Sequence, residues 1–214
     1  MFDYSKHQFT SPTFRSVVTA AVTFFLTTPV EALPPSASFF GTGVYAIYYT
    51  GTYEPYSGIP NLTSNECILP IYIGKAVPKG WRTGREPGGE KSAVLIHRLR
   101  EHARSIELTN DLLLPDFRCR LVILQGIEAD LISTVESALI RRYRPLWNTV
   151  VDGFGNHDPG RGRYNQALSE WDALHPGRSW VSRLTGTKPD RRVILEKSNA
   201  MFLLHNFRNS TTAS

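Results

Sequence analysis

The sequence is poor in cysteine, with only Cys67 and Cys119. Two cysteines without metal-ligand spacing exclude a disulfide-stapled scaffold and a cysteine-based zinc site, and they fit a reducing, cytoplasmic environment. The chain also lacks an apolar run long enough to span a membrane. The run at residues 17–26 has the length of a signal-peptide core, but Asp3 precedes it and no Ala-x-Ala site follows. We therefore expect a packed N-terminal helix there.

Acidic residues are the minority charge. The chain has 24 Lys and Arg against 19 Asp and Glu, which gives a net charge of +5 and a pI near 9.3. Such an excess suits a nucleic-acid partner, although many unrelated proteins are equally basic. The basic residues concentrate late in the chain, at Arg141, Arg142, Arg144, Arg161, Arg163, Arg178, Arg183, Lys188, Arg191 and Arg192.

Hydrophobic periodicity predicts a mixed fold. Three segments rich in β-branched and aromatic residues are expected strands, at residues 39–49, 68–74 and 117–124. Residues 90–105 and 130–143 have apolar positions at helical spacing. We therefore predict an α+β fold, with a small three-stranded antiparallel or mixed sheet flanked by helices.

The predicted organisation is one compact domain with two extensions. A helical arm at residues 1–38 precedes a core at 39–150, and an extension at 151–214 follows it. Within that extension, the sequence suggests a short helix at 164–174, a strand at 179–184 and a helix at 190–205.

Two tripeptides place one phenol in each of the first two strands. Gly-Val-Tyr ends at Tyr45, and Tyr-Ile-Gly begins at Tyr72 and is followed by Lys75. Downstream, Arg98 and His102 are one helical turn apart, so they share one face at the edge of an apolar stripe.

A carboxylate interrupts the apolar face of the second helix. Glu136 lies one turn from both Ile132 and Ile140. A buried carboxylate is costly unless it is paired or binds a metal ion. The helix is followed by Arg-Pro-Leu-Trp-Asn, which ends at Asn148.

Taken together, these motifs resemble the GIY-YIG nuclease superfamily over about residues 40–148. The Gly-rich segment 152–163 is also similar to type II restriction endonucleases of this superfamily that cut the palindrome CCGCGG. The chain departs from the common pattern in the long segment between the two tripeptides, which we predict to be a loop at residues 50–67.

The resemblance implies a role for each matched residue. Glu136 would hold Mg²⁺, with Mn²⁺ as a possible substitute, and Arg98 would neutralise charge on the scissile phosphate. Tyr45 would accept the proton of the attacking water. Because a phenol has a pKa near ~10, this role needs a cation or a hydrogen-bonded His102 to lower that pKa, and Lys75 could contribute.

Two further site residues would support this chemistry. Tyr72 would orient the nucleophile or the phosphate, and Asn148 would brace the site through side-chain hydrogen bonds. Which tyrosine is the general base stays open at this point.

Double-stranded DNA is the expected partner, bound by a homodimer. A palindrome has a two-fold axis, which a two-fold dimer matches with one active site per strand. Residues 17–26 and 193–204 could form the intersubunit contact or pack on their own core. The expected DNA contacts lie in a basic Gly-rich loop, which could equally be a solvated surface loop, and in the segment after the core: Lys79, Arg82, Arg85, Asn156, His157, Arg161 and Arg163.

Other functions fit the sequence less well. A non-catalytic basic DNA-binding module would not need the intact set of Tyr45, Arg98 and Glu136. A repair-type GIY-YIG nuclease would carry long additional domains. The chain has no Walker loop, no Pro-Asp with a correctly spaced Glu-x-Lys, and no complete HNH motif around His157.

Overall fold

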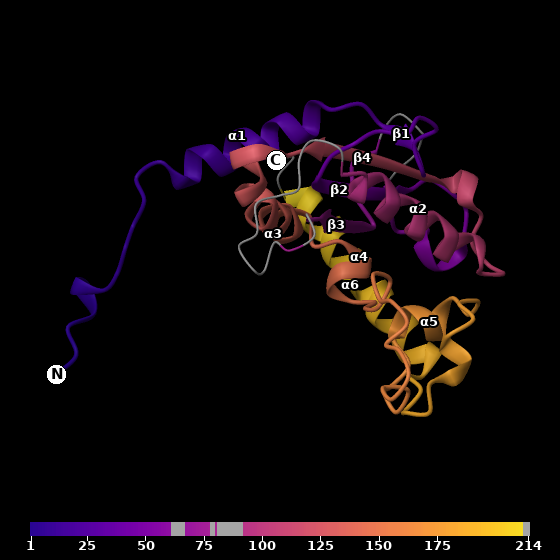
Figure 1. The fold of residues 1–214 in the computed structure, drawn as a ribbon. Coiled ribbons are helices and arrows are strands. Elements are labelled where there is room, and N and C mark those ends of the chain that lie inside the picture. The colour runs from indigo at the N-terminus through magenta and orange to yellow at the C-terminus, as the bar shows by residue number, and fades with distance from the viewer. Residues whose placement is uncertain (61–66, 78–79, 81–91, 212–214) are drawn as a thin grey trace.

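The computed structural model describes residues 1–60, 67–77, 80 and 92–211, with side chains as far as Leu203. Four strands form one antiparallel sheet in the order β1-β4-β2-β3 (Figure 1). Their bounds are β1 Glu31–Ala32, β2 Gly43–Tyr49, β3 Tyr72–Ala76 and β4 Phe117–Ile123. The predicted α+β class and antiparallel sheet are confirmed.

The predicted number of three strands was wrong, because β1 is a fourth. Glu31 and Ala32 pair with Cys119 and Arg118 at the outer edge of β4. A strand of two exposed residues has too few positions to show an alternating pattern, so the sequence carried no signal for it.

Strand β2 is buried along its whole length, and its alternating side chains divide the core into two halves. Tyr45, Ile47 and Tyr49 enter one cluster, and Val44 and Tyr48 enter the other. The first cluster is covered by four helices: α2 Val94–Glu107, α4 Leu146–Thr149, α5 Glu170–Leu174 and α6 Arg191–Thr211. The second is covered by α1 Phe14–Thr27 and α3 Ile132–Tyr143.

The N-terminal segment 17–26 forms the predicted packed helix. In α1, Val22 and Phe25 are buried against the second cluster. The residues before α1 are exposed, except for the partly exposed Ser11, and they extend away from the sheet (Figure 1). Among the described residues, no helix combines the length and the apolar character needed to cross a membrane.

The segment after the core differs from the prediction in two places. Residues 179–184 form no strand, because only a short 3₁₀ turn, Val181–Arg183, occurs there. Helix α5 begins at Glu170, where the Ser169 side chain caps it, rather than near Tyr164. Before the cap, the backbone bonds to residues 185–187 instead of forming a helix. Further 3₁₀ turns among the described residues are Tyr4–Lys6, Glu54–Tyr56, Leu114–Asp116 and Gly126–Leu131.

Candidate active site

Strands β2 and β3 bring the two predicted tyrosines together. Tyr45 lies opposite Gly74, and the ring centroids of Tyr45 and Tyr72 are 6.3 Å apart. A Cβ atom on Gly74 would lie 2.4 Å from the Tyr45 hydroxyl oxygen, so only glycine leaves room for that phenol. Tyr45 is fully buried, whereas Tyr72 is partly exposed.

Helix α2 places His102 beside Tyr45. Leu95, Leu99 and Ala103 are buried against the sheet, and this packing turns the neighbouring His102 face toward β2. The Nε2 atom of His102 is 2.6 Å from the Tyr45 hydroxyl oxygen. The imidazole also stacks on Phe154, with ring centroids 4.5 Å apart.

Burial controls the protonation of this pair. Burial and the charge of Arg98 lower the pKa of His102 well below its ordinary value, so the ring is neutral near pH 7. A neutral ring can accept at Nε2 the hydrogen bond that the Tyr45 hydroxyl donates. Burial, followed by the nearby Tyr72 phenol, raises the pKa of Tyr45 well above its ordinary value, and the Arg98 charge opposes this rise. The sequence argument needed a cation or His102 to lower the pKa of Tyr45. Arg98 is a cation that acts in that direction, but burial outweighs it and the pKa of Tyr45 is raised.

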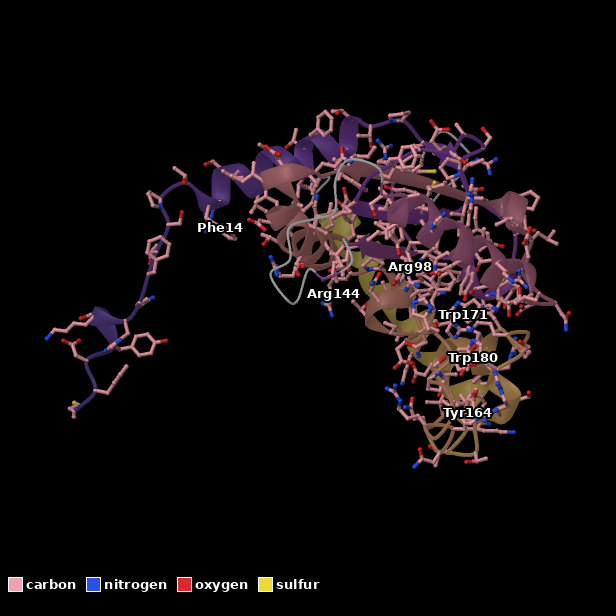
Figure 2. All side chains as sticks on the ribbon, viewed as in Figure 1. Phe14, Arg98, Arg144, Tyr164, Trp171 and Trp180 are labelled. Atoms are coloured by element: carbon pink, nitrogen blue, oxygen red, sulfur yellow. The ribbon has the colours of Figure 1, made fainter. Side chains whose placement is uncertain are left out.

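Arg98 supplies a permanent cation at the site. Its Nη1 atom is 2.9 Å from a carboxylate oxygen of Glu101 and 2.5 Å from Nε2 of His157, and its Nη2 donates to the Gly155 carbonyl at 2.8 Å. Burial and the Arg98 charge lower the pKa of His157, which suits its ring to accept this bond. Figure 2 shows Arg98 where the sheet meets the segment that carries Trp171.

Glu136 pairs with Lys75 across the edge of the sheet. The Oε2 atom of Glu136 is 2.7 Å from Nζ of Lys75, which also donates to the Ser133 hydroxyl at 3.2 Å. The Glu136 side chain is only 16% exposed, and its charge contributes to raising the pKa values of Tyr45 and Tyr72. The carboxylate therefore lies within electrostatic reach of both phenols.

The donor set at Glu136 fits a hard metal ion that takes most of its ligands from elsewhere. In the part of the chain that the structure describes, no group of three or more His, Cys, Asp or Glu could hold a metal. Mg²⁺ often binds through one or two carboxylates together with waters and substrate phosphates. A single, mostly buried carboxylate at Glu136 is compatible with that mode.

Asn148 lies at the outer edge of β3. Its Oδ1 accepts from the Ile73 amide at 2.7 Å, and its Nδ2 donates to the Ile73 carbonyl at 2.8 Å. The amide therefore holds the backbone between Tyr72 and Gly74 from outside the sheet.

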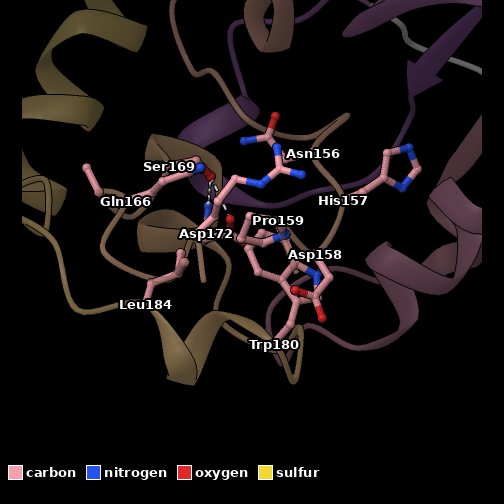
Figure 3. A pocket seen from close by; sticks show the side chains of 11 residues that line it. Asn156, His157, Asp158, Pro159, Gln166, Ser169, Asp172, Trp180 and Leu184 are labelled. Atoms are coloured by element: carbon pink, nitrogen blue, oxygen red, sulfur yellow. Dashed lines mark hydrogen bonds between the residues drawn. The ribbon is translucent and has the colours of Figure 1, made fainter. Parts of the chain in front are cut away.

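The predicted DNA contacts fall into two groups. Lys79, Arg82 and Arg85 lie outside the described residues. The others are exposed in the segment after the core, and three of them line a polar cavity of about 340 Å³ (Figure 3): Asn156, His157 and Arg163, with Arg161 exposed nearby in sequence. The contact of His157 with Arg98 was not predicted from the sequence.

Sequence reasoning missed the supporting contacts of the site. Phe154 and Gly155 contact His102 and Arg98, although segment 152–163 was expected only to bind DNA. Arg178, which was grouped with the basic residues late in the chain, is buried and ion-paired with Asp172.

An antiparallel sheet that pairs two tyrosines beside an Arg–His helix and a glutamate helix is the arrangement of a GIY-YIG nuclease. A family model described as the Eco29kI GIY-YIG domain matches residues 37–202, and the chain belongs to this family of restriction endonucleases. The family assigns it an endonuclease activity on phosphodiester bonds. A search of curated proteins found no significant match to the chain.

Proposed function

We propose that the protein is a type II restriction endonuclease that makes Mg²⁺-dependent double-strand breaks at a short, G·C-rich palindromic DNA site. One observation carries the proposal: the 2.6 Å contact between Tyr45 and a buried, neutral His102, with Arg98 beside them. This contact joins a proton donor, a proton acceptor and a phosphate-binding cation in one place. Two free, buried cysteines fit the cytoplasmic location expected of such an enzyme.

The Tyr45–His102 pair can move a proton without forming a free phenolate. As a water oxygen bonds to phosphorus, the Tyr45 oxygen takes the proton of that water, and the proton of the phenol passes to Nε2 of His102. The bond from phosphorus to the 3′ oxygen breaks, and that oxygen takes a proton from solvent. His102 then releases its proton to solvent, which restores the neutral ring. The raised pKa of Tyr45 is compatible with this relay, because the phenol stays protonated before and after the transfer.

Charge on the phosphate is balanced by the other site residues. Glu101 and His157 both contact Nη1 of Arg98. When these contacts break, the planar guanidinium can bind two phosphate oxygens. Glu136 would hold Mg²⁺, which supplies charge neutralisation at the phosphate when bound, and Mn²⁺ is a possible substitute. Lys75 then contacts Glu136 as a second cation on the same carboxylate.

Sequence specificity would come from the segments that surround the site. Arginine is the usual reader of guanine O6 and N7 in the major groove. Arg161 and Arg163 are exposed in the Gly-rich segment that continues from His157, which itself contacts Arg98. This proximity supports base reading by the same segment that borders the cleavage site.

The direct test is to incubate the protein with several unmethylated plasmids and Mg²⁺. We expect discrete fragments, and run-off sequencing of the ends should give one palindrome. Random cleavage would contradict site specificity, and intact DNA on every plasmid would favour a non-catalytic DNA-binding module.

The relay predicts a cleavage rate that is nearly independent of pH between about 7 and 9. In this range Tyr45 stays protonated, because its pKa is raised, and His102 stays neutral, because its pKa is lowered. A phenolate base would instead give a rate that rises about tenfold per pH unit. Single-turnover cleavage at constant ionic strength distinguishes the two, and a slope near one would refute the relay.

Acidic pH requires a stability control. The unfolded chain binds a proton on each histidine near pH ~6.5, whereas the folded protein keeps His102, His157 and His175 neutral to lower pH. Their contribution to the unfolding free energy is therefore present above ~6.5 and is lost as pH falls through the lower folded pKa values. A loss of rate in that range must be compared with thermal unfolding at the same pH.

A homodimer on DNA is the expected assembly. Helices α1 and α6 each bury one side in the core and leave apolar side chains exposed, including Val17 and Phe24 on α1 and Val193 and Leu203 on α6. Sedimentation with a short cognate duplex should give two chains per duplex. One chain per duplex, with nicked circles accumulating before linear DNA, would instead indicate sequential nicking.

A further inference from the structure

A buried arginine stands behind the segment that contacts Arg98. Arg178 follows α5 and forms a side-on ion pair with Asp172: Nε is 2.7 Å from Oδ1, and Nη2 is 2.5 Å from Oδ2. The two side chains are only 3% and 1% exposed. Ser169 donates from its hydroxyl to the same carboxylate at 2.6 Å, so Asp172 is fixed at the start of α5.

The remaining donors of Arg178 hold the backbone of residues 153–156. Its Nη1 donates to the carbonyls of Phe154 and Asn156 at 3.1 and 3.0 Å, and its Nη2 donates to the Gly153 carbonyl at 3.0 Å. One guanidinium therefore fixes three of the four carbonyls in this segment.

The fourth carbonyl, that of Gly155, accepts from Arg98 instead. His157, directly after the held segment, contacts the same guanidinium. The direction of Arg98 is therefore set by backbone that Arg178 holds from behind.

This arrangement goes beyond what stability requires. A buried ion pair is often no more stabilising than an apolar pair of the same volume, because both charges lose their hydration. What the guanidinium contributes is direction: a planar fork can satisfy a carboxylate and three carbonyls at once, and a lysine ammonium cannot.

We propose that Arg178 is a positioning residue for DNA cleavage, which acts through residues 153–157 to aim the Arg98 guanidinium at the scissile phosphate. The inference rests on the proposed nuclease function. It assigns to a residue that is itself buried away from DNA a specific effect on the rate of the chemical step.

The test is a double-mutant cycle with Arg178→Lys and Arg98→Lys. We expect Arg178→Lys to lower the single-turnover cleavage rate about 100-fold in the wild-type background, because a misplaced group can cost a hundredfold. The Kd for cognate DNA in Ca²⁺ should change less than about threefold. In the Arg98→Lys background the same substitution should cost less than about threefold, because the group that it positions has already been replaced.

Thermal unfolding separates this role from a structural one. Any fall in Tm caused by Arg178→Lys should be equal in both backgrounds, whereas the fall in rate should not. An equal loss of rate in both backgrounds would overturn the positioning role while leaving the nuclease function intact. A wild-type protein that leaves cognate DNA uncut would overturn the function itself, and the inference with it.

A second variant covers the case in which Arg178→Lys does not fold. The pair Asp172→Leu with Arg178→Met removes both charges at similar volume, so no buried carboxylate is left unpaired. We expect a folded, slow enzyme, and a wild-type rate would overturn the inference.

The matched control is Arg183→Lys. Arg183 makes an ion pair with Asp158 next to the same segment, but the two side chains are 50% and 38% exposed. The Arg183→Lys variant should cleave within about twofold of the wild-type rate. A loss of rate equal to that of Arg178→Lys would show that the effect is not specific to the buried arginine.

Discussion

Replacing Glu136 with glutamine is expected to slow DNA cleavage by about a thousandfold, because metal-dependent charge stabilisation contributes several kcal/mol to lowering the barrier. Glutamine keeps the shape of the side chain and removes the charge that pairs with Lys75. Because Lys75 is 36% exposed, the lost ion pair should change the free energy of unfolding little. The measurement is single-turnover cleavage of cognate DNA across a titration of Mg²⁺ and of Mn²⁺.

The same experiment includes two comparisons. Glu107→Gln removes an equal charge from an exposed side chain at the C-terminal end of α2, outside the proposed metal site, and should cut at the wild-type rate. DNA binding by the Glu136 variant should remain within about threefold of wild type. Full activity of Glu136→Gln at ordinary Mg²⁺ concentrations would remove Glu136 from the proposed metal site.

Tyr45→Phe should produce a loss of similar size. The substitution removes the oxygen that contacts His102 and so interrupts the proposed proton relay. General acid–base catalysis contributes about 100- to 10,000-fold to a reaction rate. The substitution also leaves a buried imidazole nitrogen without its partner, which costs about 1–3 kcal/mol of stability. The rate must therefore be measured well below the unfolding temperature of the variant.

Tyr48→Phe is the matched control for this loss. Tyr48 lies in the same strand, is also buried, and points into the opposite half of the core. Removal of the Tyr48 hydroxyl should change the free energy of unfolding without slowing DNA cleavage. A fast Tyr45→Phe enzyme together with an inactive Tyr72→Phe enzyme would transfer the proton-accepting role to Tyr72, which is the more exposed of the two phenols.

Local patterns predicted the elements that carry the site. Strand β2 was predicted from its continuous run of apolar and aromatic residues, and β4 from a similar composition. Helices α2 and α3 were predicted from apolar residues at helical spacing, because each helix buries one face. The four-residue spacing of Arg98 and His102 predicted that both lie on one side of α2.

Contacts between distant segments could not be predicted in the same way. The ion pair of Lys75 with Glu136, and the bonds from Arg178 to residues 153–156, depend on how helices and loops dock in three dimensions. Arg178 was grouped with the basic residues late in the chain, and only the fold reveals the buried Asp172 beside it. Protonation of the Tyr45–His102 pair likewise follows from burial, which residue type alone does not reveal.

The position of Asn148 also bears on how the edge of the sheet is protected from pairing with other chains. Strand β3 ends the sheet, and an unpaired strand edge is a template for aggregation with other chains. The Asn148 side chain hydrogen-bonds to both the amide and the carbonyl of Ile73, as a neighbouring strand would. The Trp147 amide donates to the Ile71 carbonyl. Loss of activity in an Asn148 variant therefore has to be read beside its solubility, since the same amide shields the edge of the sheet.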